Sequence, residues 1–178
     1  MANTVVNTSA SRSRVALWSF AAALLLLPLV AMQFTQEVNW TLADFLVFGT
    51  MLVIACGAYE LATRASGNKA YRIAAGVAVA TAFILVWVNL AVGIIGTEGT
   101  PANLMYGGVI AVGGIGALIA RFQARGMARA LVATAVAQAL VAVIAVVAGL
   151  GYTLVVTAFF VALWLTYAWQ FGKAAQTD

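Results

Sequence analysis

Long apolar stretches, separated by short polar segments, run through almost the whole chain. Each of six stretches is long enough to cross a bilayer, since a transmembrane helix needs about 20 mostly apolar residues. The sequence therefore predicts an all-α, polytopic membrane protein whose six transmembrane helices form three antiparallel hairpins. The predicted spans lie at about 15–34, 42–62, 73–95, 103–121, 130–149 and 153–171.

Two parts of this pattern have an alternative interpretation. Only Gly-Leu-Gly-Tyr at 149–152 separates the last two stretches, but one helix of about 40 residues would be too long for a single span. Because glycine permits a turn and weakens a helix, we expect a break there. The first stretch could be the core of a signal peptide, although it contains Pro28 and no clean small-residue cleavage site follows it.

The predicted spans leave no room for a separate soluble domain. We expect one transmembrane domain over residues 15–173, preceded by a flexible cytoplasmic leader at 1–14 and followed by a C-terminal tail at 174–178.

Basic residues occur only at the two ends of the chain and in every second connection between the predicted spans. All nine lie before the first span, after the last, or in the second and fourth connections. The first and third connections carry only Glu37 and Glu98, and the fifth is uncharged. Under the positive-inside rule this distribution predicts that both termini are cytoplasmic. The nine are Arg12, Arg14, Arg64, Lys69, Arg72, Arg121, Arg125, Arg129 and Lys173.

Composition agrees with a membrane protein. Hydrophobic residues make up 65% of the 178 residues and charged residues only 8%, whereas about a quarter of a soluble protein is charged. The net charge of +4 is spread over short segments that flank the spans. We therefore interpret it as a topology signal and expect membrane lipid, not nucleic acid, as a partner.

The residues that common catalytic and metal chemistry needs are scarce. The chain has no histidine, which excludes the usual haem ligation and histidine acid–base catalysis. Its single cysteine, Cys56, cannot build a thiolate metal site or a redox pair, and its five acids are scattered. We expect no enzyme activity, metal or cofactor. A membrane enzyme that uses Glu98 and Asn103 on a lipid headgroup is conceivable, but no motif supports it.

Polar residues near the outer ends of the third and fourth spans form a candidate polar cluster. A charged group at the bilayer centre costs about 2.5–3.5 kcal/mol, so polar groups in spans are candidates for function. The structural alternative is that Asn89 bonds a neighbouring helix, a contact worth about 0.6 kcal/mol. The cluster consists of Asn89, Glu98, Asn103 and Tyr106.

Three further polar residues are secondary candidates, each with a structural explanation. Asp44 lies three residues after Thr41, which suits a capped first helical turn. Glu60 has Arg64 one turn later, which predicts an interfacial ion pair. Gln138 lies deep in the fifth span, where we expect it to join two helices by hydrogen bonding.

Glycines in the fourth span predict close helix packing. They do not form a nucleotide-binding loop, because no Gly-Lys-Ser/Thr follows them. Small residues let membrane helices approach closely, and Thr100 followed by Pro101 predicts the start of this helix. The glycines are Gly107, Gly108, Gly113, Gly114 and Gly116.

A weak internal repeat relates the two basic connections. Arg64 and Arg121, and likewise Arg72 and Arg129, are 57 residues apart. This spacing suggests tandem hairpins of the kind that some transport folds use. Chance similarity between alanine-rich helices is the alternative.

Three segments carry a resemblance to a known kind of protein: residues 59–61, the run from Trp87 to Glu98, and the run from Pro101 to Tyr106. They resemble small uncharacterised bacterial integral membrane proteins with no assigned activity, over about residues 40–140. The resemblance implies a multi-pass location in the bacterial inner membrane and brings no substrate or cofactor with it.

Two functions are compatible with the sequence. The first is a non-catalytic membrane component, namely an accessory subunit, a scaffold or a self-associating structural protein in a larger complex or homo-oligomer. The second is a small oligomeric transporter or channel whose outer entrance is the candidate polar cluster.

Overall fold

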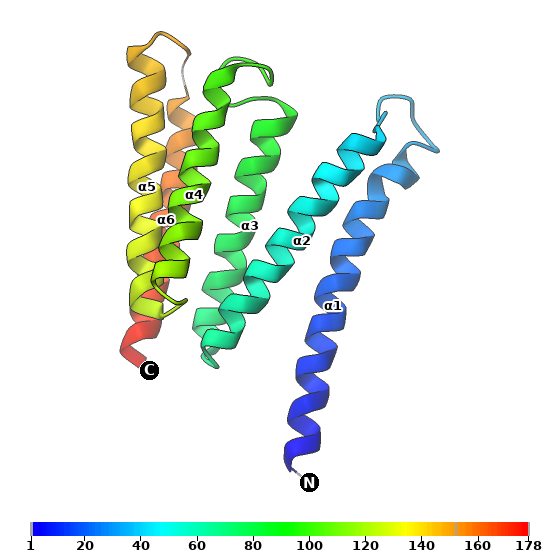
Figure 1. Cartoon of the computed structure of the whole chain (residues 1–178), viewed down its shortest axis with the longest axis vertical. Helices are drawn as coiled ribbons and strands as arrows, with labels where there is room; N and C mark the ends of the chain where they lie inside the picture. The colour runs from blue at the N-terminus through cyan, green and yellow to red at the C-terminus, as the bar shows by residue number, and fades with distance from the viewer. Residues whose placement is uncertain (1, 152, 178) are drawn as a thin grey trace. The chain divides into compact units, whose positions relative to one another are not determined.

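Six long helices make up the computed structural model, which describes the backbone of residues 2–151 and 153–177 and the side chains of residues 12–151 and 153–176. No strand occurs in the described part of the chain. Figure 1 shows the helices α1 (Ala2–Ala31), α2 (Leu42–Ala65), α3 (Lys69–Ala91), α4 (Met105–Ile119), α5 (Ala124–Val147) and α6 (Leu154–Thr177). A short 3-10 helix, η1 (Pro101–Leu104), directly precedes α4.

All six predicted apolar helices are confirmed. Each of the six is long and apolar enough to cross a membrane, with the fourth span counted from Pro101 to Ile119. The break between the fifth and sixth is also confirmed, because α5 ends at Val147 and α6 begins at Leu154. Gly149 makes this break with a φ of 67°, a conformation that disfavours residues with a Cβ atom.

Two helix boundaries differ from the expected positions. α1 begins at Ala2, so residues 2–14 of the leader expected to be flexible are helical; they contain neither glycine nor proline to interrupt the helix. α3 ends at Ala91 and not near residue 95, because Gly93 turns the chain with a φ of 73°.

The chain forms two compact units. Unit 1 covers residues 1–58 and unit 2 covers residues 59–178. In unit 1, Leu25 of α1 lies beside Gly49 of α2, where an added Cβ atom would be 3.7 Å away. The ring of Trp40 meets Phe45 and Phe48 edge to face, with centroids 5.2 and 5.3 Å apart.

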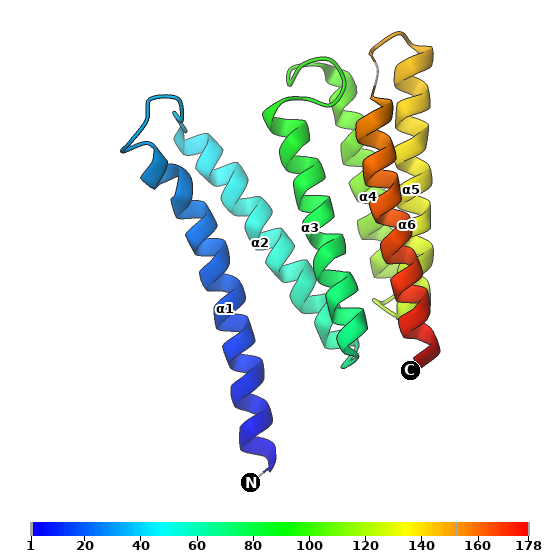
Figure 2. The same ribbon diagram turned by 180° about the vertical axis from the view of Figure 1, so that it is seen from behind.

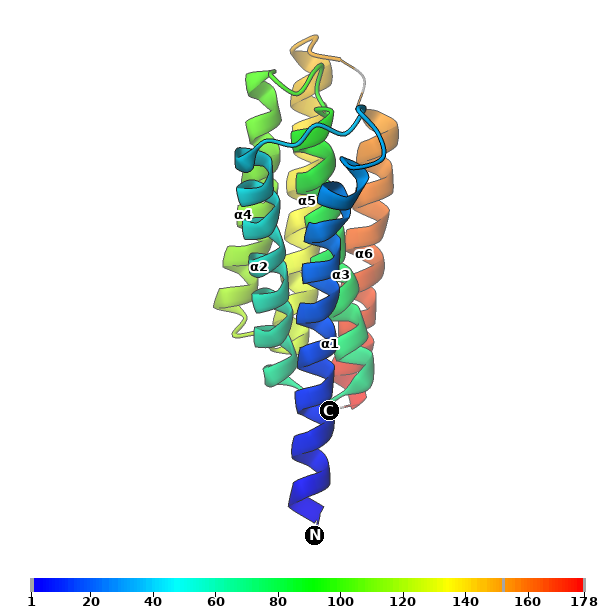
Figure 3. The same cartoon turned by 90° about the vertical axis from the view of Figure 1, so that its right-hand side faces the viewer.

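Unit 2 is a four-helix bundle of α3 to α6, whose helices alternate in direction (Figures 1 and 2). α5 has the closest contacts, with α6 on one side and α4 on the other, and Figure 3 shows it between these two. α3 packs mainly against α6 and meets α4 much less. The largest apolar core side chains are Tyr71, Leu85, Ile95, Tyr106, Val109, Trp164 and Phe171.

Close packing of α4 on α5 depends on two of the five glycines. A Cβ atom at Gly116 would lie 2.8 Å from the Cβ of Ala130, and one at Gly113 would lie 3.0 Å from Oγ1 of Thr134. The other glycines, such as Gly114, have nothing within 4 Å of that position. Close approach of two membrane helices therefore needs glycine on only one face of α4.

Candidate functional site

Asn103 organises the loop between α3 and α4. Its side chain is only 4% exposed. Its Oδ1 accepts hydrogen bonds from the backbone N–H groups of Ile94 and Ile95 at 3.0 and 2.9 Å. Its Nδ2 donates to the carbonyls of Ile95 and Thr97 at 3.2 and 2.7 Å. Both polar atoms of the amide are thus used by the backbone of one loop.

Two left-handed glycines and a threonine hydrogen bond shape the loop that surrounds the Asn103 side chain. Gly93 and Gly96 have φ values of 73° and 68°, and a Cβ atom at Gly93 would lie 2.4 Å from the carbonyl carbon of Thr97. Thr97 donates its N–H to Oγ1 of Thr100 at 3.1 Å. Pro101 then occupies the start of η1, so the expected helix start after Thr100 is confirmed, as a 3-10 turn that leads into α4.

The candidate polar cluster comes together only in part. Asn89 of α3 donates from Nδ2 to the backbone carbonyl of Asn103 at 3.1 Å, which ties α3 to the start of the next helix. Glu98 is exposed in the loop. Tyr106 is 1% exposed and its hydroxyl faces Thr153 and Thr157 near the start of α6. The contact between the two asparagines agrees with the prediction from the sequence.

Two secondary candidates have the structural roles that their spacing predicts. Oδ2 of Asp44 accepts from the backbone N–H and the hydroxyl of Thr41 at 2.7 and 2.8 Å, which forms a reciprocal cap at the start of α2. Glu60 and Arg64 form an ion pair at 3.4 Å on the same helix. At an exposed position such a pair contributes little to stability.

Gln138 forms no direct hydrogen bond of the expected kind among the described residues. The side chain is 0% exposed, but neither Nε2 nor Oε1 has a hydrogen-bond partner in the part of the chain that the structure describes. It therefore does not join two helices by a direct hydrogen bond. Sequence position alone could not show this, because it depends on which side chains of the adjacent helices face residue 138.

Tyr71 is a linking residue that the sequence analysis did not identify. It lies near the start of α3, where Asn68 caps the helix by accepting from the N–H of Ala70 at 2.8 Å. Its hydroxyl donates to the backbone carbonyl of Phe122 in the turn between α4 and α5. A tyrosine in the first turn of a helix has no spacing that would mark this distant partner.

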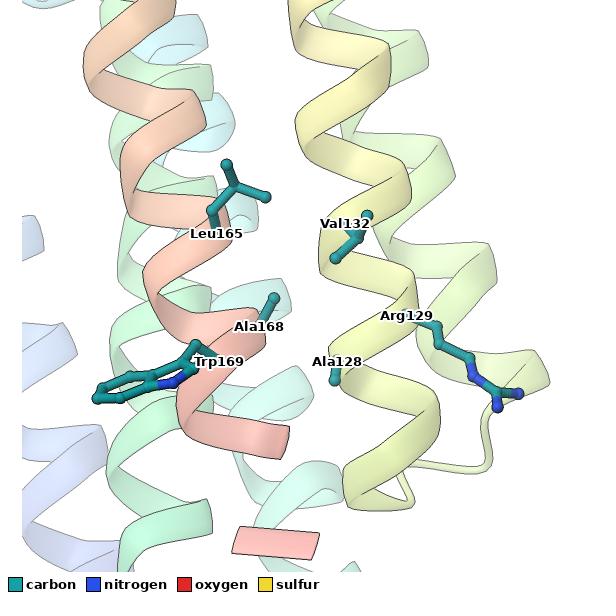
Figure 4. A pocket seen from close by; sticks show the side chains of 6 residues that line it. All are labelled: Ala128, Arg129, Val132, Leu165, Ala168 and Trp169. Atoms are coloured by element: carbon teal, nitrogen blue, oxygen red, sulfur yellow. The ribbon is translucent and has the colours of Figure 1, made fainter. Parts of the chain in front are cut away.

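A shallow groove separates α5 and α6 at the end of the bundle where α5 begins (Figure 4). Ala128 and Val132 point from α5 toward α6, and Leu165 and Ala168 point back, whereas Arg129 and Trp169 point outward. Lys173 holds its Nζ 3.6 Å from the centre of the Trp169 ring. The groove is thus apolar between the helices, and cationic and aromatic side chains flank it. Its lining residues are Ala128, Arg129, Val132, Leu165, Ala168 and Trp169.

Metal-binding groups and membrane-spanning helices bear on the class of the molecule. Within the described residues, no group of three or more His, Cys, Asp or Glu side chains could hold a metal ion. Six apolar helices define the class of the molecule as a multi-pass helical membrane protein. Compared with family models, curated proteins and solved structures, the chain matches none.

Proposed function

We propose that the protein is a non-catalytic integral membrane component, acting as an accessory subunit, a scaffold or a self-associating structural protein. This proposal rests on the hydrogen bonding of the Asn103 side chain. This buried amide side chain forms four hydrogen bonds to the loop between α3 and α4. A residue used in this way positions helices, because no donor or acceptor atom of its amide is left over for a solute.

Helix packing supports the same proposal. Gly113 and Gly116 let α4 approach α5 closely, which makes a tightly packed interface between the two helices. Many large apolar side chains are exposed, among them Phe20 at 65%, Leu61 at 49% and Phe159 at 58%. In a membrane such side chains face lipid or a partner helix, so we propose membrane lipid and either a larger complex or further copies of this chain as partners.

The proposed arrangement in the membrane is three antiparallel hairpins with both termini in the cytoplasm. In unit 2 the alternation of α3 to α6 brings the connection before α3, the turn between α4 and α5, and the end of α6 to the same end of the bundle (Figure 1). These segments carry the basic residues from Arg64 onward, and the positive-inside rule favours a cytoplasmic location for them. The proposed membrane is the bacterial inner membrane, on the resemblance described above.

Native mass spectrometry of the tagged protein, extracted gently from its own membranes, tests the proposal. We expect either a foreign subunit at a fixed stoichiometry or a defined homo-oligomer that survives dilution. A monomer under every mild extraction condition, together with solute flux in reconstituted vesicles, would contradict it.

Transport through an oligomer is the second candidate function. One observation favours it, namely that polar atoms buried among the helices of unit 2 have no partner among the described residues, including Oδ1 of Asn89. In a transporter with an outer entrance at this position, Asn89→Leu abolishes flux, whereas in a scaffold it leaves assembly nearly intact. Flux assays on reconstituted vesicles and the oligomeric state of the same variant separate the two functions.

A further inference from the structure

Unit 2 buries a set of polar side chains that lack hydrogen-bond partners among the described residues. A buried polar atom without a partner costs free energy, so such atoms in a native protein commonly mark a bound molecule. Five of these side chains are more than nine-tenths buried and come from three neighbouring segments. They are Tyr106 (1% exposed), Gln138 (0%), Thr153 (2%), Thr157 (6%) and Trp164 (2%).

Thr157 differs from the other helical threonines whose side chains the structure describes. A threonine hydroxyl in a helix usually bonds the carbonyl four residues earlier. Thr157 does not, although the carbonyl of Thr153 is in the right position and accepts the backbone N–H of Thr157 at 2.8 Å. The usual bond, 2.7 to 2.9 Å long, is present at Thr50, Thr81, Thr134 and Thr166.

The hydroxyl of Thr153 also lacks a hydrogen bond to the nearby backbone within the described residues. It directly precedes α6, at the position where a threonine hydroxyl normally accepts from the first amides of a helix. Its hydroxyl makes no such bond within the described residues. Two adjacent turns therefore place hydroxyl groups without a backbone partner in the interior of the bundle.

Tyr106 faces both of these hydroxyls from α4. Its phenol oxygen lies close enough to Thr153 and Thr157 to interact with both hydroxyls, but none of these contacts has the geometry of a well-formed hydrogen bond. Each hydroxyl can donate once and accept twice, so a small molecule between the three can be bound by all of them. Since Tyr106 lies one turn after Asn103, the loop that Asn103 orders also holds the phenol in place.

Gln138 lies slightly deeper in the same interior. α5 and α6 are antiparallel, and Val132 lies opposite Leu165 across the groove. At 1.5 Å rise per residue, Gln138 is therefore between the depths of Thr157 and Trp164. Its amide offers two donors and one acceptor oxygen, all without a partner in the described residues.

We propose that these side chains form an internal binding site for a small uncharged hydrogen-bonding molecule, with Tyr106, Thr153 and Thr157 around it and Gln138 beneath it. The site offers donors and acceptors but no formal charge, so its ligand carries both kinds of group and is neutral. The smallest molecule of this class is water, and a neutral solute of a few heavy atoms is the other source of the same chemistry. The inference holds whether the protein is a scaffold or a transporter.

Thermal unfolding of variants with nearly the same side-chain volume tests the proposal, because a bound molecule and a dry site change the melting temperature in opposite directions. Thr157→Val keeps the volume and removes the hydroxyl. If a bound molecule uses that hydroxyl, the melting temperature falls by about 2–4 °C, since roughly 1 kcal/mol is lost. If the site is dry, the variant removes an unpartnered polar group and the melting temperature rises. Thr81→Val is the matched control, because its hydroxyl is equally buried and is bonded to Val77.

Radiolytic labelling tests for bound water in the wild-type protein, so its main result does not depend on the folding of a variant. Hydroxyl radicals form from water at the site, so bound water leads to oxidation of Tyr106 despite its burial. Tyr71 is the control, because it is 0% exposed and its hydroxyl is bonded to a carbonyl. In labelled water the added oxygen carries the isotope, and Thr157→Val lowers the oxidation of Tyr106 several-fold.

Native mass spectrometry tests for the alternative ligand, a neutral solute. A constant small added mass in the wild-type protein that Thr157→Val removes identifies a neutral solute. The proposal is overturned if Tyr106 is as protected as Tyr71 and no such mass is present, or if Thr157→Val raises the melting temperature.

Discussion

The hydroxyl of Tyr71 donates a hydrogen bond to the backbone carbonyl of Phe122, which lies 51 residues further along the chain. Arg121 and Phe122 lie in the turn after α4 with φ values of 48° and 57°, a conformation that residues with a Cβ atom rarely adopt. The ring of Tyr71 also meets Phe171 of α6 edge to face, with centroids 5.0 Å apart. One side chain thus joins three segments at the basic end of unit 2.

Tyr71→Phe isolates the hydrogen bond in this contact. The variant keeps the ring against Phe171 but leaves the partly buried carbonyl of Phe122 without its donor. We expect a loss of about 1 kcal/mol in unfolding free energy, measured by thermal or denaturant unfolding in detergent. Tyr167→Phe, on the half-buried side of α6, is the control and should be close to neutral.

Replacing the two asparagines of the α3–α4 loop separates their contributions. Asn103→Leu leaves four backbone groups without a partner, so we expect a loss of about 3 kcal/mol and a faster proteolytic cut in the loop. Asn89→Leu frees only one carbonyl and should cost about 1 kcal/mol or less. Equal losses for the two variants would show that Asn103 does not organise the loop.

Gly116 should be intolerant of even one methyl group. A Cβ atom there would lie 2.8 Å from that of Ala130, so we expect Gly116→Ala to cost about 1–3 kcal/mol by separating α4 from α5. Gly114→Ala on the open face of the same helix is the control and should be neutral or stabilising. Ala130→Gly should rescue Gly116→Ala, which a double-mutant cycle measures directly.

Cysteine labelling tests the proposed orientation. In a Cys56→Ala background, Glu98→Cys should react with a membrane-impermeant maleimide added to intact cells. Gln123→Cys, in the turn at the basic end, should react only after the cells are permeabilised. Both positions are exposed in the structure, so access depends on the side of the membrane. The reverse pattern would invert the topology.

The groove between α5 and α6 predicts a preference for anionic phospholipid. Basic residues beside an apolar groove attract anionic headgroups by about 1 kcal/mol each, so Arg129→Gln should lower the fraction of co-purified anionic lipid about fivefold. Lys173→Gln should act in the same direction. Lys69→Gln, which does not line the groove, should leave the native mass spectrum of bound lipid unchanged.

Interactions within one helix or one loop were the most predictable part of the candidate sites. Thr41 with Asp44 and Glu60 with Arg64 follow from helical spacing, and both pairs are formed. The proximity of Asn89 and Asn103 also follows, because a short loop joins their helices. The detailed role of Asn103 does not, since its four bonds depend on the left-handed turns at Gly93 and Gly96.

The sequence by itself determines the six apolar helices, because bilayer thickness and hydrophobicity act on each segment separately. Only the tertiary structure decides which face of each helix is interior. In a membrane protein the lipid-facing and core-facing sides are both apolar, so no hydrophobic periodicity distinguishes Gly116 from Gly114. For the same reason, the contact of Tyr71 with Phe122 and the lack of a partner at Gln138 depend on how neighbouring helices are rotated.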